Sequence, residues 1–179
     1  MFAGKLSGKD GALTSSTSKK VLISRFDRET LTGFVNPQSY LGSLGVELLG
    51  VSGNAFVIPY SEIKMVCFVR DFDMEEASPT KRFFASRPKM AGLWARFRFR
   101  DGDTLEGLLA NNLLLQEPYG YTFIPPDPTF HNQKIFSPRL ALTEVQILGV
   151  IGSPLRPSRP KRHPSKQPKQ ENPQLEMFK

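Results

Sequence analysis

The sequence predicts an all-β protein, and three observations support that class. Residues 30–34 (Thr-Leu-Thr-Gly-Phe) return in similar form as residues 104–108 (Thr-Leu-Glu-Gly-Leu), an offset of 74 positions. Each copy follows a short apolar strand pattern and a charged turn, which is typical of a β-hairpin. Helical periodicity is weak along the whole chain. A β-rich unit that occurs twice accounts for all three observations.

The elements of the two copies follow the same order. The first copy has a strand at 21–26, a turn at 27–29 and a second strand from Thr30, and it closes with an apolar run after Glu62. The second copy repeats this order with a strand at 93–99, a turn at 100–103 containing Asp-Gly, a second strand from Thr104, and an apolar run after Glu144. Gly33 and Gly107 are expected where each second strand bends or bulges. A short, bent five-strand unit of this kind is typical of Sm-like or SH3-like barrels, so we predict two such barrels in tandem.

The chain divides into five segments. Residues 1–19 are rich in Ser and Gly and are expected to be disordered. Residues 20–70 form the first predicted barrel, 71–91 a charged linker, and 92–152 the second barrel. Residues 153–179 contain six prolines and are expected to be a disordered, basic tail. The middle of about 130 residues is long enough for one ordinary domain or for two small barrels that share a core.

The net charge of +7 lies entirely in the two ends of the chain. Residues 20–152 hold 14 basic and 14 acidic residues, whereas residues 1–19 carry a net +2 and residues 153–179 a net +5. This distribution excludes a uniformly basic domain. No stretch approaches the ~18–20 apolar residues of a membrane span, so a soluble, cytoplasmic protein is expected.

One part of the sequence resembles a known family. Residues 58–72 (Ile-Pro-Tyr-Ser-Glu-Ile-Lys-Met-Val-Cys-Phe-Val-Arg-Asp-Phe), with residues 33–37 upstream, resemble an uncharacterised bacterial family with paired barrel-like repeats. The resemblance covers about residues 20–150. It implies the barrel fold and no activity.

No catalytic motif is present, and we expect neither an enzyme nor a bound metal or cofactor. The single cysteine, Cys67, has no partner for a disulfide and lies in an apolar run, which favours a buried strand thiol. His131 lies in a loop near Asp127, where a turn residue is the preferred interpretation. An enzyme or nucleotide sensor would need a ligand pocket near that pair.

A nucleotide sensor of the PilZ kind is the less favoured alternative. That family pattern has an Arg-x-x-x-Arg element and a later Asp/Asn-x-Ser-x-x-Gly. Here Arg25 and Arg28 are three positions apart rather than four, and Pro37 occupies the acidic position before residues 39–42. Both elements fail by one residue.

One strand carries a candidate nucleic-acid surface. With a period of two, one face of residues 94–100 presents an indole and three guanidinium groups, while the other presents apolar side chains. The members of the polar face are Trp94, Arg96, Arg98 and Arg100. Such a row is able to bind phosphates and stack a base. The preferred interpretation is an ordinary solvent face whose charges pair with Asp101, Asp103 or the acidic linker.

The tail ends in a pentapeptide, Gln174-Leu175-Glu176-Met177-Phe178. It resembles the peptide by which bacterial replication and repair proteins dock on the DNA polymerase sliding clamp, with Glu176 in place of the more usual Ser or Asp. The resemblance implies that the apolar side chains enter a groove while the Gln174 amide fixes the register. The partner-binding residues are then Gln174, Leu175, Met177 and Phe178. The alternative is a segment that folds back on the body.

We therefore predict a non-enzymatic adaptor that docks on the sliding clamp and serves DNA replication or repair. In this interpretation the basic residues of the tail, among them Arg159, Lys161 and Arg162, lie along DNA phosphates. The competing prediction is a nucleic-acid-binding Sm-like module in which the tail only adds charge.

Overall fold

Ten β-strands and two short 3₁₀ turns make up the computed structural model, which describes residues 18–72, 79, 81–127 and 134–152. The strands are β1 (Lys19–Arg25), β2 (Thr30–Val35), β3 (Gly45–Gly50), β4 (Ala55–Pro59), β5 (Ile63–Phe68), β6 (Gly92–Phe99), β7 (Thr104–Leu109), β8 (Gly120–Ile124), β9 (Lys134–Pro138) and β10 (Leu142–Ile151). The turns are η1 (Leu113–Leu115) and η2 (Arg139–Ala141). The all-β class is confirmed for these residues.

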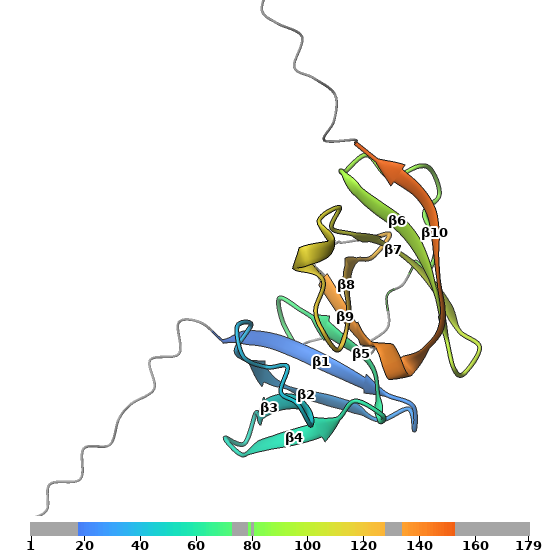
Figure 1. Cartoon of the computed structure of the whole chain (residues 1–179). Helices are drawn as coiled ribbons and strands as arrows, with labels where there is room; N and C mark the ends of the chain where they lie inside the picture. The colour runs from blue at the N-terminus through green and yellow to red at the C-terminus, as the bar shows by residue number, and fades with distance from the viewer. Residues whose placement is uncertain (1–17, 73–78, 80, 128–133, 153–179) are drawn as a thin grey trace, which may run out of the picture.

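All ten strands belong to one open antiparallel sheet, in the order β10-β6-β7-β8-β9-β5-β1-β2-β3-β4 (Figure 1). Within it, the N-terminal half (β1–β5) and the C-terminal half (β6–β10) have the same internal order, with the fifth strand beside the first. The halves are joined because β5 pairs with β9. The described strands therefore form one continuous sheet, since the last strand of the first half pairs with the second half.

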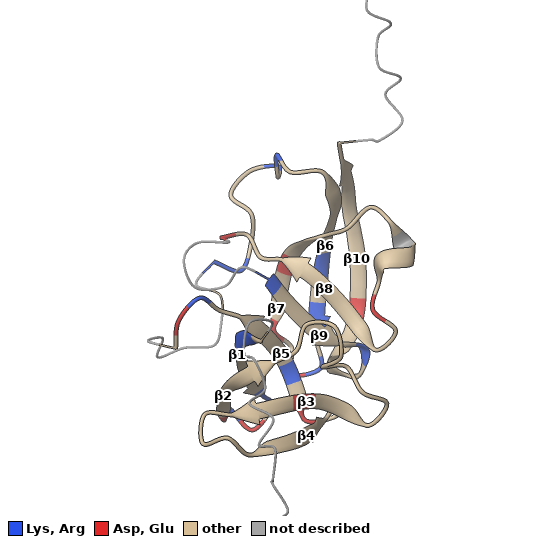
Figure 2. Cartoon of the chain, turned by 90° about the vertical axis from the view of Figure 1, so that its left-hand side faces the viewer, with Lys and Arg blue, Asp and Glu red and all other residues tan. Residues whose placement is uncertain are grey.

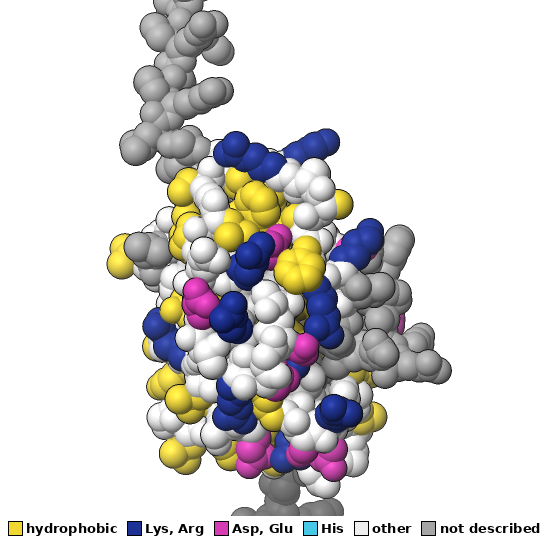
Figure 3. Space-filling view, turned by 90° about the vertical axis from the view of Figure 1, so that its right-hand side faces the viewer, with side chains coloured by type: hydrophobic (Ala, Val, Ile, Leu, Met, Phe, Trp, Pro, Cys, Tyr) yellow, Lys and Arg dark blue, Asp and Glu magenta, His cyan; other side chains and the backbone are white. Residues whose placement is uncertain are grey.

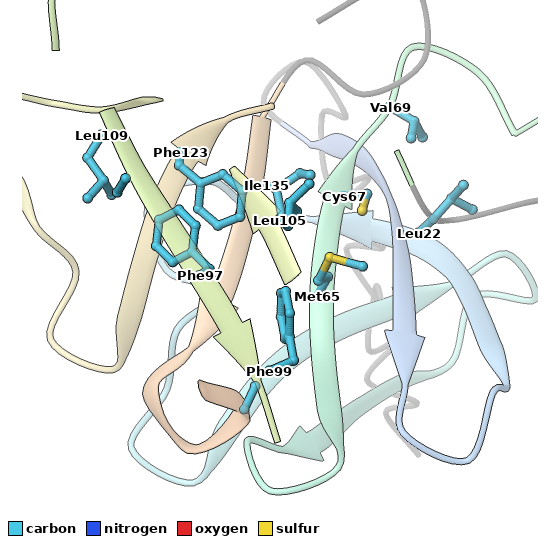
Figure 4. Packing of buried hydrophobic residues seen from close by; sticks show 12 residues of the cluster. Leu22, Met65, Cys67, Val69, Phe97, Phe99, Leu105, Leu109, Phe123 and Ile135 are labelled. Carbon is cyan, nitrogen blue, oxygen red and sulfur yellow. The ribbon is translucent and has the colours of Figure 1, made fainter. Parts of the chain in front are cut away.

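The sheet has a hydrophobic core on each side of its central strands. Val21 and Ile23 of β1 belong to the core of the N-terminal half. Leu22 between them belongs to the core of the C-terminal half, which Figure 4 shows. β5 divides in the same way, with Val66 on one side and Cys67 on the other. Strands buried on both faces read as continuous apolar runs rather than as alternation, which explains the sequence of β1 and β5.

The turn after β1 and the turn after β6 are the same structure. In residues 25–29 the first amide donates to the last carbonyl at 3.0 Å, and in residues 99–103 the equivalent distance is 2.8 Å. In both turns an aspartate carboxylate accepts the backbone N–H two residues later. The fourth residue has a positive φ in each, 71° for Arg28 and 88° for Gly102. The offset of 74 therefore holds for the backbone as well as for the sequence.

This equivalence predicts opposite effects of two substitutions. Arg28 is a non-glycine residue in the left-handed region, and this conformation costs about 1–2 kcal/mol. Glycine removes that strain but increases the entropy of the unfolded chain. Arg28→Gly should therefore raise the free energy of unfolding by a net amount of about 0.5–1 kcal/mol. Gly102→Ala should lower it by about 1 kcal/mol. Urea denaturation of both variants checks the pair. A loss of stability in Arg28→Gly would contradict the argument.

The bulge expected as one possibility at Gly33 and Gly107 is wrong, and so is the alignment of the closing runs on Glu62 and Glu144. No bulge occurs at Gly33 or Gly107, where β2 and β7 keep a continuous register with the preceding strand. Glycine is required there for close packing: a Cβ on Gly107 would lie 2.3 Å from the Phe123 ring. The bulges lie instead in the β5 and β10 pairings. Their registers place Met65 and Glu144 in equivalent positions, three residues away from an alignment on Glu62.

Candidate binding surface

The predicted row of basic side chains lies on the outer face of β6, away from the core. Ala95, Phe97 and Phe99 are buried in the C-terminal core, as the alternation predicts. On the opposite face Trp94 is paired in register with Leu108, and Arg96 with Glu106 on β7. In Figure 2, blue segments lie on β6 and a red segment lies on the neighbouring strand β10.

Glu106 is a buried carboxylate that organises this face. Its side chain is 4% exposed, and it accepts hydrogen bonds from the Trp94 indole Nε1 at 3.1 Å and from Arg96 Nη2 at 2.8 Å. It also accepts the backbone N–H of Phe84 at 3.2 Å. A buried carboxylate needs such partners to offset its lost hydration. The guanidinium of Arg96 and the indole N–H are therefore already engaged within the protein.

The other two arginines of the row also have partners. Arg98 Nη1 lies 3.6 Å from Glu144 on β10. Arg100 follows the end of β6, where its guanidinium lies 3.7 Å from the centroid of the Phe26 ring and donates to the carbonyl of Ser61. The charges of the row are thus paired locally, although with partners other than those considered from the sequence.

Asp101 and Asp103 pair with basic residues outside this row. Both accept from Lys64 of β5 at 2.5 Å, and Asp103 also pairs with Arg82 at 2.8 Å. The hydrogen bond from Lys64 is the main cause that holds the pKa of Asp103 below its ordinary value. This cluster links the first turn of the C-terminal half to the N-terminal half.

The backbone N–H and the carboxylate of Glu106 hold residues 81–90 over the outer face of β7. The carbonyl of Arg82 accepts the backbone N–H of Glu106 at 2.8 Å, in addition to the bond from Phe84 to the carboxylate. The Phe84 ring packs edge-on against Trp94, with centroids 6.2 Å apart. Sequence reasoning missed Glu106, although the hairpin register set by the turn at 99–103 places it opposite Arg96.

A pocket of about 320 Å³ lies between this segment and the sheet. Its floor is apolar, formed by Leu108 of β7 and Ile124 at the end of β8. Phe83 and Met90 lie in its wall and are 51% and 50% exposed. The basic residues at its rim are Lys81, Arg87 and Lys89. No acidic side chain is among the described residues that line it, so it suits a ligand with an apolar group and a negative charge.

The neighbourhood of the pocket includes the last described residue of the chain. Arg87 Nη2 donates to the carbonyl of Val150 at 3.3 Å, and Asn111 donates to the carbonyl of Gly152 at 3.5 Å. In the upper part of the face shown in Figure 3, basic side chains lie beside exposed apolar ones. β10 therefore ends close to the pocket.

A second pocket, of about 240 Å³, includes residues of both halves. Lys19, Lys20, Tyr40 and Phe68 line it from the first half, and Glu117 and Lys134 from the second. Lys20 is paired with Asp71 at 2.7 Å. Burial raises the pKa of the Tyr40 hydroxyl, which stays protonated and neutral.

Cys67 and Arg25, two described residues considered from the sequence as a nucleophile and as part of a nucleotide site, are buried or paired within the protein. Burial raises the pKa of the Cys67 thiol to about 12, so the thiolate form is disfavoured. Arg25 pairs with Asp27, Glu29 and Glu62 at 2.7–3.1 Å. No group of three or more His, Cys, Asp or Glu side chains suited to a metal ion occurs among the described residues. None of their helices is long and apolar enough to cross a membrane.

Several predicted residues lie outside the described residues. They are the pentapeptide residues Gln174, Leu175, Met177 and Phe178, the tail residues Arg159, Lys161 and Arg162, and His131. Their assignments stay predictions. Asp127, the neighbour of His131 in sequence, is described and pairs with Lys81 at 3.0 Å.

The described residues define an all-β fold built on one ten-stranded antiparallel sheet. Within that class the chain belongs to DUF6982, a family of unknown function whose model matches residues 17–149. The expected membership of an uncharacterised family is therefore confirmed. No curated protein and no solved structure matches the chain.

Proposed function

We propose that the chain is a non-enzymatic adaptor that docks on the bacterial DNA sliding clamp through Gln174-Leu175-Glu176-Met177-Phe178 and so serves replication or repair. The pentapeptide itself carries this proposal. In a polar tail, Leu175, Met177 and Phe178 form an apolar cluster, and burying one such side chain is worth about 1.5–3 kcal/mol. Less the entropy of ordering, three anchors suggest an affinity in the range of about 1 μM.

Two features of the described body support the adaptor role: its two similar halves and the pocket near the end of β10. We interpret its two halves as tandem Sm/SH3-like units, an interpretation favoured by their equal strand order and equivalent turns. The pocket under residues 81–90 would hold a second ligand, and β10 ends beside it. The 21 residues from 153 to 173 would span up to about 65 Å if extended at ~3.1 Å per residue, which separates the clamp from the body.

Titration of purified sliding clamp with a peptide of residues 170–179 and with the full chain tests the proposal. We expect binding near 1 μM and a loss of at least about 100-fold for the full chain with Leu175→Ala and Phe178→Ala, since each truncation removes an anchor. The matched control is Leu155→Ala, an apolar residue of the same tail outside the pentapeptide. Absence of binding at about 100 μM, or unchanged binding of the double variant, would overturn the proposal.

A second candidate function is single-stranded nucleic-acid binding by the body. It is favoured by the basic rim of the pocket next to the exposed Phe83 ring, rather than by Arg96 and Arg98, which are paired with carboxylates. Phosphates would lie on Arg87 and Lys89 while a base stacks on the ring.

The full chain with Arg87→Ala and Lys89→Ala tests this candidate. It should elute from a nucleic-acid column at lower salt than the chain with Arg96→Ala and Arg98→Ala, because the rim charges are the freer ones. Equal elution of both variants at the position of the unaltered chain would exclude a role for either set.

A further inference from the structure

The joint between the two halves is an antiparallel pairing of β5 with β9. Residues 66–68 of β5 lie opposite residues 134–136 of β9, with Val66 paired to Phe136 and Cys67 to Ile135. These four side chains are fully buried. The fifth strand of the first half thus meets the fourth strand of the second half in a well-packed contact.

The strand registers show which strand of the other half corresponds to β5 and which corresponds to β9. In the β1–β5 pair the bulge falls between Ser24 and Arg25, and β6–β10 has a bulge at the equivalent place, so residues 145–147 of β10 correspond to residues 66–68 of β5. A second correspondence links β4 to β9. Gly45 faces Pro59 as Gly120 faces Pro138, and both glycines approach the opposite strand too closely for a Cβ.

By these registers, residues 55–57 of β4 correspond to residues 134–136 of β9. Each half therefore has one strand equivalent to β5 and one equivalent to β9. Among the described strands, only β5 and β9 themselves form this pairing. The unused pair is the β4 strand of the first half and the β10 strand of the second.

These two strands are the edges of the sheet. Among the described strands, β4 pairs with β3 alone and β10 with β6 alone. At β4, Phe56 and Val57 are 41% and 50% exposed, and at β10 Ile147 is 49% exposed. The equivalents of Phe56 and Val57 in the joint, Ile135 and Phe136, are fully buried.

The β4 edge lacks the charged side chains that protect many edge strands against pairing. β4 (Ala-Phe-Val-Ile-Pro) contains no charged residue. An uncharged apolar edge strand with free N–H and C=O groups is a template for another strand. The backbone of β4 suits pairing with a strand like β5, because β9, which is in the equivalent position of the other half, already pairs with β5.

We propose that β4 of one copy of this chain pairs antiparallel with β10 of a second copy and repeats the internal joint. The expected register places Val57 opposite Val145 and Phe56 opposite Gln146. Because the two surfaces differ, the contact is head-to-tail, and copies assemble into a closed ring or an open filament. This assembly is independent of clamp docking.

Light scattering and sedimentation of the full chain test the assembly at about 100 μM, where contacts of micromolar Kd are populated. We expect complexes of more than one copy. Val57→Glu blocks the β4 edge and Ile147→Glu the β10 edge, and each variant alone should be monomeric. Mixed, the two should form a one-to-one dimer, because each retains one working edge and the pair has no other. The control Leu114→Glu alters a side chain that is 93% exposed and outside the edge strands, and it should assemble like the unaltered chain.

An intermolecular disulfide tests the register. Opposed residues of antiparallel strands have Cα atoms about 4.5–5.5 Å apart, within the range for a disulfide. The full chain with Phe56→Cys and Gln146→Cys should form a ladder of crosslinked copies on oxidation, whereas Leu114→Cys with Gln146→Cys should not. Cys67 is buried and does not compete. A monomeric unaltered chain, failure of the mixed variants to dimerise, or equal ladders from both cysteine pairs would overturn the proposal.

Discussion

Replacing Glu106 by alanine is expected to lower the free energy of unfolding by about 2–4 kcal/mol, which is large for a residue outside both cores. The substitution leaves the Trp94 indole N–H and the Phe84 backbone N–H without their acceptor. It also removes the partner of Arg96, although that guanidinium is 43% exposed and recovers part of its hydration. The larger cost therefore comes from the two N–H groups and from the loosened segment of residues 81–90.

Trp94 is the one tryptophan of the chain, so its fluorescence reports both the stability and the local change. The matched control is Glu144→Ala, which removes an exposed partner of Arg98 at 3.6 Å and should cost less than about 1 kcal/mol. The pocket should be lost in Glu106→Ala, because Phe84 forms part of its wall. Equal stability of the two variants would show that burial of Glu106 contributes nothing beyond a surface ion pair.

Local signals in the sequence predicted the local structure. The hairpins were predictable because a charged turn, followed by Thr-Leu-x-Gly, fixes the geometry of residues 25–29 and 99–103 within a few positions. The outward row of β6 was predictable for the same reason, since alternation depends on the strand alone. The all-β class follows from these elements together.

The arrangement between the halves depended on contacts that no local pattern encodes. β5 and β9 are paired although about 70 residues separate them, and the sequence of neither strand indicates which strand it pairs with. The continuous apolar run of β5 did contain a signal, because a strand buried on both faces needs a layer on each side. That signal favours a shared sheet over two separately closed barrels.

The candidate pocket was missed because its wall was assigned to a linker. Residues 81–90 include four basic residues and belong to a charged stretch of the sequence, but the Glu106 carboxylate and backbone hold them on β7. Glu106 occupies the place that Thr32 has in the first half. The change from a small polar residue, Thr32, to a charged one, Glu106, at equivalent positions of the repeat is the signal in the sequence that indicates this role.

Gly45→Ala is expected to cost about 3 kcal/mol or more and to unfold both halves together. A Cβ at Gly45 would lie 2.1 Å from the carbonyl oxygen of Ile58, so the backbones of β3 and β4 would have to separate. Gly120→Ala should act alike in the C-terminal half, where the Cβ would meet the carbonyl oxygen of Ser137 at 2.3 Å. The matched control is Gly149→Ala in β10, whose nearest neighbour would be 3.9 Å away and which should change stability by less than about 1 kcal/mol.

Trp94 lies in the C-terminal half, so its unfolding transition shows how far a defect at Gly45 extends. The two cores share β1, β5 and β9, and Leu22 and Val21 of a single strand pack on opposite sides. A loss of packing in the N-terminal half should therefore lower the denaturation midpoint recorded by Trp94. A Trp94 transition that is unchanged in Gly45→Ala but shifted in Gly120→Ala would instead mean that the halves unfold as separate units, because a defect confined to one independently folding unit leaves the other intact.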